Sequence, residues 1–338
     1  MASVAAIPFL RVSGTHREVG RQVGAATAET VRRAVSVPFD PALVEHYRAA
    51  TAEHLPWVLD ELEGVAEGAG VDPFAVFAAS VVELVSGGAP APGRCTDLVA
   101  MPEVTADGHL LVAHNNDYTA ESERDYVAIE WHVPGEPVCF TLGLRPWLAV
   151  GWNDAGLSVT ANELAPADER VGIPRVLQMR DVATRRTLAD AVEAVLHPAR
   201  ASSYNWVLAH RDGRAANVEG GACRAEITEP EQGVLAHTNH YTHPTLLDLE
   251  RSTRVAGSIA RLCRAQELLA ARDEPWTADA LLDVLSDHEN APDSLCRHGD
   301  ADGARTVFWC VADVTAGNTR YGSGPPCASE PASYRLQG

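Results

Sequence analysis

Residues 86–101 read Ser-Gly-Gly-Ala-Pro-Ala-Pro-Gly-Arg-Cys-Thr-Asp-Leu-Val-Ala-Met, and the character of the chain changes within this stretch. The glycines and prolines of residues 86–93 predict a turn-rich segment that can continue neither a helix nor a strand. The apolar, partly alternating residues 96–101 are typical of a strand. We therefore predict that a helical part of the chain ends here and that a sheet begins, with Cys95 at the boundary.

The sequence before this boundary carries the signals of helices. Thr15 with Glu18 fits a capping box ahead of an amphipathic stretch that reaches about residue 34. Two Asp-Pro pairs, at 40–41 and 72–73, each place an N-cap residue before a proline suited to the first helical turn. The helices that follow these pairs are expected to run to about residues 68 and 86. The first ninety or so residues are accordingly predicted to be helical.

The sequence after the boundary alternates between groups of strands and helical blocks. Consecutive strand-like segments in the middle of the chain are too close together for crossover helices, which argues against a βαβ arrangement. The pattern predicts an α+β fold in which sheets are covered by helices. The expected strands are 96–101, 109–113, 126–133, 138–142, 157–162, 204–209, 305–313 and 319–322, and the expected helices are 174–196, 246–272 and 278–286.

Composition narrows the range of functions. The 338 residues are 46% hydrophobic and 22% charged, which is typical of a globular protein of one large domain or two closely associated ones. All 27 basic residues are arginine, so lysine-based Schiff-base chemistry is excluded. With 46 acidic residues the net charge is -19, which disfavours binding to nucleic acid or to an anionic membrane surface.

The start of the chain and its cysteines indicate a compartment. The first eleven residues lack the basic region of a signal peptide, and no apolar stretch reaches the roughly 18–20 residues that span a bilayer. The seven cysteines cannot all pair. We expect a cytoplasmic, reducing setting with free thiols.

A functional role for Cys95 depends on three polar motifs further along the chain. On its own a cysteine is most often a small buried hydrophobe, and each motif could be an Asx turn, a strand end or a capped helix end. The motifs are His114-Asn115-Asn116-Asp117-Tyr118, His237-Thr238-Asn239-His240 and Ser294-Leu295-Cys296-Arg297.

Together with Cys95-Thr96, these motifs resemble a known family in their order. The set Cys-Thr, Asn-x-Asp-[Trp/Tyr], His-Thr-Asn-His and Ser-[Ile/Leu]-Cys-Arg is similar to that of the acyl-coenzyme A:6-aminopenicillanic acid acyltransferase family, also called peptidase family C45. These are self-processing N-terminal-nucleophile hydrolases. The resemblance covers nearly the whole chain and implies a four-layer αββα sandwich.

The resemblance also implies that the precursor cuts itself between Arg94 and Cys95. The products would be a helical α chain, residues 1–94, and a β chain, residues 95–338, which stay associated as one αββα domain. Family members commonly have glycine where this chain has Arg94, so a bulky residue must fit the precursor loop.

Catalytic roles follow from the same resemblance, residue by residue. Cys95 matches the nucleophile and Asn239 the asparagine that stabilises the oxyanion. Asp117 matches the aspartate that organises the surroundings of the nucleophile. Arg297 matches the arginine after Ser-[Ile/Leu]-Cys, where a fixed cation can hold a carboxylate or stabilise developing charge.

Three further residues of the motifs are candidates for substrate binding, namely Thr96, Tyr118 and His240. Asp97 departs from the family, which often has a small hydroxyl residue at that position. An acid so close to Cys95 should raise the pKa of the thiol unless it pairs with a cation, such as the new α-ammonium group.

The implied chemistry explains why cleavage would create activity. A thiol has an ordinary pKa near 8.5, and a free α-amino group, with a pKa of about 7.7–8.0, can take its proton, whereas an amide nitrogen cannot. Freed Cys95 would then hydrolyse a small amide-linked metabolite, or transfer its acyl group, through a thioester. No cofactor is expected, and acyl-CoA would be the co-substrate if the reaction is acyl transfer.

Two alternatives stay open. One is a metal-dependent hydrolase that uses His237, His240 and His243, although residues three apart on a strand point to opposite faces and no HExxH helix is present. The other is a catalytically inactive binding protein on the same fold, because a fold does not guarantee chemistry.

Overall fold

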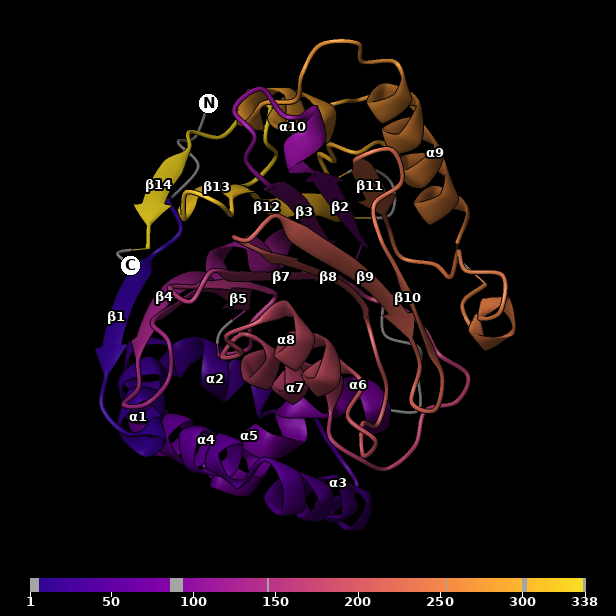
Figure 1. Cartoon of the computed structure of the whole chain (residues 1–338). Coiled ribbons are helices and arrows are strands. Elements are labelled where there is room, and N and C mark those ends of the chain that lie inside the picture. Colours follow the sequence, from indigo (N-terminus) through magenta and orange to yellow (C-terminus); the bar gives the residue numbers. More distant parts are fainter. Residues whose placement is uncertain (1–5, 86–93, 145, 254, 300–302, 337–338) are drawn as a thin grey trace.

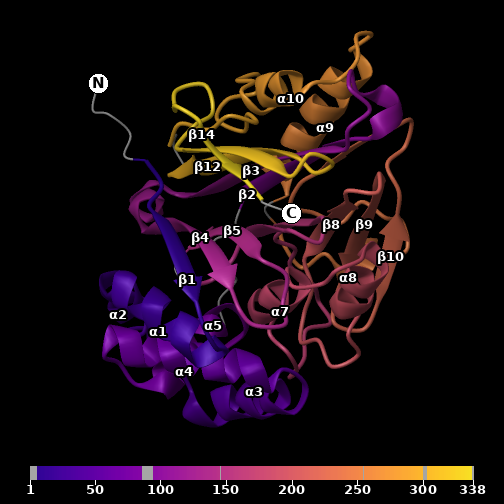
Figure 2. The same ribbon diagram turned by 60° about the vertical axis from the view of Figure 1, so that its left-hand side comes forward.

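Two β-sheets lie face to face, and helices cover the outer face of each (Figure 1). The computed structural model describes residues 6–85, 94–144, 146–253, 255–299 and 303–336. The predicted turn segment 86–93 lies outside these residues. The layers run helix, sheet, sheet, helix, so the predicted α+β, four-layer αββα fold is confirmed (Figure 2).

The larger sheet has eight strands. Their order across the sheet is β1-β4-β5-β6-β7-β8-β9-β10, and all neighbours are antiparallel except β1 and β4. The bounds are β1 Phe9–Ser13, β4 Tyr126–His132, β5 Cys139–Leu144, β6 Val150–Asn153, β7 Leu157–Asn162, β8 Asn205–His210, β9 Arg214–Gly220 and β10 Ala225–Thr228.

The smaller sheet has six antiparallel strands in the order β11-β2-β3-β12-β13-β14. In this sheet β2, which begins at Arg94, lies between β11 and β3. The bounds are β2 Arg94–Ala100, β3 Leu111–Thr119, β11 Val234–His237, β12 Ala304–Asp313, β13 Asn318–Ser323 and β14 Ala332–Arg335.

Apolar side chains join the layers. Val99 and Val112 of the small sheet pack with Phe140 and Val207 of the large sheet in the space between the sheets. Alternate residues of a strand point to opposite faces, so Leu98 and its neighbours instead pack against α9 (Ala256–Ala270) and α10 (Ala278–Leu285). On the other side, α7 (Arg175–Val182) and α8 (Leu188–Val195) cover the large sheet.

The helices before residue 86 begin where the sequence predicts but are shorter. The capping box of Thr15 and Glu18 is present, and both Asp-Pro pairs cap helices. The expected long helices are interrupted at Thr27 and before Pro56. At Pro56 the cause is the proline itself, which cannot continue a helix from the preceding turn. The bounds are α1 His16–Ala26, α2 Ala28–Ala34, α3 Pro41–His54, α4 Pro56–Ala69, α5 Pro73–Ser80 and α6 Val82–Val85.

The expectation that the first ninety residues are all helical is wrong at one place. Residues 9–13 form β1, the edge strand of the large sheet, which pairs in parallel with β4. The helical blocks 174–196 and 246–272 are likewise shorter than expected, since the first divides into α7 and α8 and the second holds only a short 3₁₀ turn, 247–249, before α9. Within the described ranges, every helix is too short or too polar to cross a lipid bilayer.

Four glycines let α1 and α4 approach each other closely. A methyl group at Gly20 or Gly24 of α1 would lie 2.0 or 2.1 Å from a backbone oxygen of α4. A methyl group at Gly64 or Gly68 of α4 would lie 2.1 Å from a backbone oxygen of α1. Since helix spacing depends on the side chains at the contact, only glycine permits this packing.

We therefore expect Gly24→Ala to lower the free energy of unfolding by about 1–3 kcal/mol, because the helices must separate to admit the methyl group. Alanine would normally stabilise a helix, so the sign of the change is diagnostic. Urea unfolding followed by circular dichroism measures it. Ala25→Ser, at the neighbouring exposed position, should change the free energy far less; equal or greater stability of Gly24→Ala would contradict the close packing.

Candidate active site

Cys95 is the second residue of β2 and faces the space between the two sheets. It lies opposite Asn116 of β3, and Asp97 lies opposite His114. Because side chains alternate along a strand, these four residues share one face of the β2–β3 ladder with Val99 and Val112 of the inter-sheet core. The register of two strands therefore assembles a polar cluster around the thiol.

Asp97 and His114 form a fully buried ion pair beside Cys95. The carboxylate Oδ1 lies 2.7 Å from the imidazole Nδ1, and both side chains are inaccessible to solvent. Burial lowers the pKa of His114, but Asp97 outweighs it and brings that pKa to about 10. His114 therefore supplies the cation that Asp97 was expected to need, so Asp97 does not depend on the α-ammonium group that cleavage would create.

The thiol of Cys95 is buried and lies within this cluster. Burial raises the pKa of Cys95, and a hydrogen bond with His114 acts against that rise. The Sγ atom also donates to Asn116 Oδ1 at 3.7 Å, and Asn116 in turn donates to Tyr126 Oη at 3.0 Å. An imidazolium beside a thiol favours the thiolate, which is the nucleophilic form.

Asn239 holds the backbone nitrogen of Cys95. Its Oδ1 accepts a hydrogen bond from Cys95 N at 2.6 Å and another from Arg261 Nη2 at 2.8 Å. Its Nδ2 donates to the carbonyl oxygen of Glu163 at 3.1 Å. The structure therefore brings Asn239 directly to Cys95, although they lie 144 residues apart.

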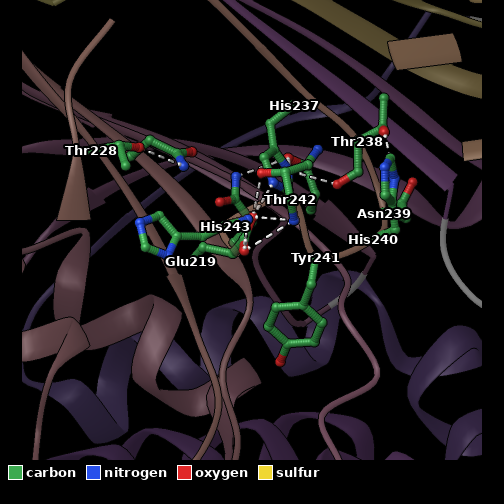
Figure 3. A network of polar contacts seen from close by, with 12 residues as sticks. Glu219, Thr228, His237, Thr238, Asn239, His240, Tyr241, Thr242 and His243 are labelled. Atoms are coloured by element: carbon green, nitrogen blue, oxygen red, sulfur yellow. Dashed lines mark hydrogen bonds and ion pairs between the residues drawn. The ribbon is translucent and has the colours of Figure 1, made fainter. Parts of the chain in front are cut away.

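A polar network fixes the segment 237–243 that carries Asn239 (Figure 3). The buried carboxylate of Glu219 on β9 lies 2.9 Å from His237 Nε2 and accepts hydrogen bonds from the backbone nitrogens of Thr242 and His243. The hydroxyl of Thr242 also donates to it, at 2.7 Å. These contacts anchor the segment on both sides of Asn239.

Asp117 and Arg297 lie close to each other but on the other face of the ladder. Asp117 pairs across the strands with Arg94, one residue before Cys95. Its Oδ1 accepts from Thr306 Oγ1 at 2.7 Å, and the same hydroxyl accepts from Arg297 N at 3.1 Å. Burial raises the pKa of Asp117, while the charges of Arg261 and Arg297 oppose that rise.

Arg261 is a site residue that the sequence motifs do not include. It is 1% exposed, and its Nη2 donates to Asn239 Oδ1 and, at 3.4 Å, to the carbonyl oxygen of Cys95. Burial lowers its pKa to about 10. One feature of the sequence could have indicated Arg261. Residues 258, 261, 262, 265 and 269 have the spacing of one buried helix face, and an arginine is unexpected on such a face.

The three candidates for substrate binding lie in different surroundings. Tyr118 alternates with Asn116 on the face of Cys95 and is 36% exposed, so it suits a contact with a substrate. Thr96 is fully buried and points to the opposite face, towards the helices. His240 Nδ1 lies 2.7 Å from Ser258 Oγ, and burial lowers the pKa of His240 to about 4.

The three histidines of the metal alternative do not converge. His237 contacts Glu219 and Asn162, His240 contacts Ser258, and His243 contacts Thr245. Among the described residues they form no group of ligand atoms close enough to share a metal ion. The structure therefore contradicts the alternative of a metal-dependent hydrolase built on these histidines, because each side chain contacts a different part of the protein: β7 and β9 for His237, α9 for His240 and the loop after His243.

Several solved structures are distantly similar to this chain. A Caenorhabditis elegans N-acylethanolamine-hydrolyzing acid amidase ortholog matches with 16% identity and a TM-score of 0.45, covering 65% of this chain and 93% of its own. A variant of conjugated bile acid hydrolase from Clostridium perfringens matches with 14% identity and a TM-score of 0.49, covering 72% of this chain and 97% of its own. Penicillin V acylase from Agrobacterium tumefaciens matches with 16% identity and a TM-score of 0.48, covering 71% of this chain and 84% of its own. These likenesses are too weak to indicate an activity for this chain.

The family comparison is more informative. No curated protein matched the chain significantly. The sequence model of the family described as acyl-coenzyme A:6-aminopenicillanic acid acyl-transferase matches residues 104–325, which is well over half of the chain and includes Asp117, Asn239 and Arg297. The chain therefore belongs to the acyl-coenzyme A:6-aminopenicillanic acid acyl-transferase family, whose members are N-terminal-nucleophile amidohydrolases and acyltransferases.

Proposed function

We propose that this protein cuts itself before Cys95 and then uses the freed Cys95 to hydrolyse a small amide, or to transfer its acyl group, through a thioester. One observation carries the proposal: Asn239 Oδ1 holds the nitrogen of Cys95 at 2.6 Å while the thiol lies in the polar cluster of the inter-sheet face. That nitrogen is the atom that cleavage would convert from an amide to an amine. Family membership supports the same chemistry.

The first reaction in this scheme is self-cleavage. The Cys95 thiol attacks the carbonyl carbon of Arg94, a carbon–sulfur bond forms, and the carbon–nitrogen bond to Cys95 breaks as that nitrogen takes up a proton. Water then hydrolyses the thioester. The products are the carboxylate of Arg94 and the free α-amino group of Cys95, and with them the α chain 1–94 and the β chain 95–338.

The second reaction repeats these steps on a substrate. The α-amino group takes the proton of the thiol, the thiolate attacks the amide carbonyl, and the leaving amine departs with a proton. Water attacks the thioester in hydrolysis, whereas a second amine attacks it in acyl transfer. Acyl-CoA would replace the amide as acyl donor in the transferase version.

Charge that develops on the carbonyl oxygen needs donors placed in advance. An amide side chain has two N–H donors, and one from Asn239 goes to the carbonyl oxygen of Glu163. We assign the other to the oxyanion. Arg261 orients the amide by holding its Oδ1, and Asp117 and Arg297 set the local charge next to the scissile Arg94–Cys95 bond.

For these reasons, we expect Asn239→Ala to lower kcat about 10²–10³-fold, the usual effect of removing one oxyanion donor. It also frees the nitrogen of Cys95, so self-cleavage should slow in parallel. Steady-state kinetics and a time course of chain cleavage measure the two effects. Asn217→Ala, which removes a buried asparagine from β9 outside the Cys95 cluster, should leave both rates within a few-fold; unchanged rates in Asn239→Ala would remove Asn239 from the mechanism.

The function itself is tested by trapping the acyl-enzyme. The purified protein is mixed with a panel of small amides, quenched in acid, and its β chain is searched by mass spectrometry for an acyl group on Cys95 that hydroxylamine removes. Adding a primary amine separates the two reactions, because acyl transfer yields a new amide and hydrolysis yields only the acid. No adduct and no product with any amide or acyl-CoA would favour the inactive binding protein.

A further inference from the structure

Four side chains with metal-binding atoms meet at one end of the smaller sheet, away from the face that carries the Cys95 thiol. His288, Cys296 and His298 lie between α10 and β12, and Cys327 follows β13. One ligand atom from each lies within 4.8 Å of all the others. His288, His298 and Cys327 are exposed, and Cys296 is buried, so the group lies at the surface with one member anchored in the protein.

The separations within this group have the size of the edges of a zinc tetrahedron. Cys296 Sγ lies 3.5 Å from Cys327 Sγ, and His298 Nε2 lies 3.6 and 3.3 Å from these two sulfurs. His288 Nε2 lies 3.0 Å from His298 Nε2. Bond lengths of about 2.3 Å to sulfur and about 2.0–2.1 Å to nitrogen give edges of about 3.8, 3.5 and 3.3 Å in a regular tetrahedron.

The group suits zinc better than it suits a disulfide or a hard cation. A disulfide needs its sulfurs about 2.03–2.05 Å apart, and these two sulfurs are 3.5 Å apart as free thiols. Two thiols and two imidazoles also supply an S₂N₂ donor set, which selects zinc over magnesium or calcium. Zinc requires deprotonated cysteines, so binding would release the two thiol protons to solvent.

We propose that His288, Cys296, His298 and Cys327 bind one zinc ion. All four positions of the tetrahedron are taken by protein ligands, so the ion is structural and does not activate water. It joins the segment that follows α10 to the segment that follows β13. The zinc proposal does not depend on the catalytic proposal, and either can fail without the other.

The ion would also position part of the candidate active site. Arg297 lies between two of the ligands, Cys296 and His298, and its backbone nitrogen donates to Thr306 Oγ1 at 3.1 Å. That hydroxyl donates to Asp117 Oδ1 at 2.7 Å. Fixing the residues on both sides of Arg297 therefore fixes the backbone that supports Asp117.

Metal analysis of untagged protein, purified without chelators from zinc-supplemented cells, tests the proposal. We expect about one zinc per chain in the wild type, as a closed four-ligand site requires. Cys327→Ser should lose most of the zinc, because it removes a ligand. Cys223→Ser, at an exposed cysteine outside the group, should keep it. Loss of zinc should also lower the thermal midpoint of Cys327→Ser relative to Cys223→Ser.

A second measurement on the wild type covers the case in which Cys327→Ser does not fold. Cobalt(II) added after removal of zinc should give the intense thiolate-to-metal absorption and the visible bands of a tetrahedral site. Wild-type protein without bound zinc and without this spectrum would overturn the proposal. So would equal zinc in wild type and Cys327→Ser, or an unreduced mass lower by two hydrogens together with a peptide linking Cys296 to Cys327.

Discussion

Cys95→Ala is expected to remain a single chain and to lose about 10⁶-fold in turnover, the loss seen when a nucleophile that acts as part of a unit is removed. Both reactions need the same sulfur: self-cleavage uses it on the carbonyl of Arg94, and catalysis uses it on the substrate. Alanine fits the buried strand position, so the fold should survive. Kinetics with the amide panel and gel analysis of the chain measure the two losses.

Two control variants separate chemistry from packing. Cys139→Ala removes another buried cysteine, on β5 in a separate part of the core, and should process itself and turn over substrate as the wild type does. Cys95→Ser keeps a nucleophile whose proton is harder to remove, so slow processing should remain. Turnover by Cys95→Ala at more than a small fraction of the wild-type rate would exclude Cys95 as the nucleophile.

Asp97→Ala is expected to lower the free energy of unfolding by about 3–5 kcal/mol near pH 6, because it leaves the other half of a fully buried ion pair without its partner. Chemical unfolding at several pH values measures the effect. Asp107→Ala, which removes an exposed aspartate 3.5 Å from His109, is the matched control and should change the free energy by about 1 kcal/mol or less.

The same pair predicts the pH dependence of stability. The pKa of His114 rises from 6.5 to about 10 on folding, so the folded state holds a proton that the unfolded state loses first. The contribution of the pair is therefore complete below about pH 6.5 and disappears as the pH rises towards about 10. Asp97→Ala should lack this decline, and a wild-type stability that is flat over this range would contradict a charged His114.

Local signals explain which parts of the fold were predictable. The capping box of Thr15 and Glu18 and the two Asp-Pro caps are contained within a few residues, and each marks a helix start in the structure. β1 was missed because Phe9–Ser13 becomes a strand only by pairing with β4, more than a hundred residues later. The helix ends at Thr27 and before Pro56 were also missed, because the apolar periodicity of the sequence continues across both positions.

The candidate site was predictable only as a list of motifs. The sequence indicated that Asp97 needs a cation, but the partner depends on the register that places Asp97 opposite His114. Arg261 enters the site because α9 packs against β2 and β11, a contact that no spacing in the sequence encodes. The group of His288, Cys296, His298 and Cys327 could not be predicted either, because the spacing of these four positions matches no common zinc motif.

Intact-mass spectrometry of freshly purified protein under denaturing conditions, beside Cys95→Ala, tests the central claim most directly. The account predicts two fragments in the wild type, the larger beginning at Cys95 and the smaller ending at Arg94, and one uncut chain in the variant. A wild-type protein that stays uncut, yet turns over amides at the same rate as Cys95→Ala, would contradict both the self-cleavage and the role of Cys95.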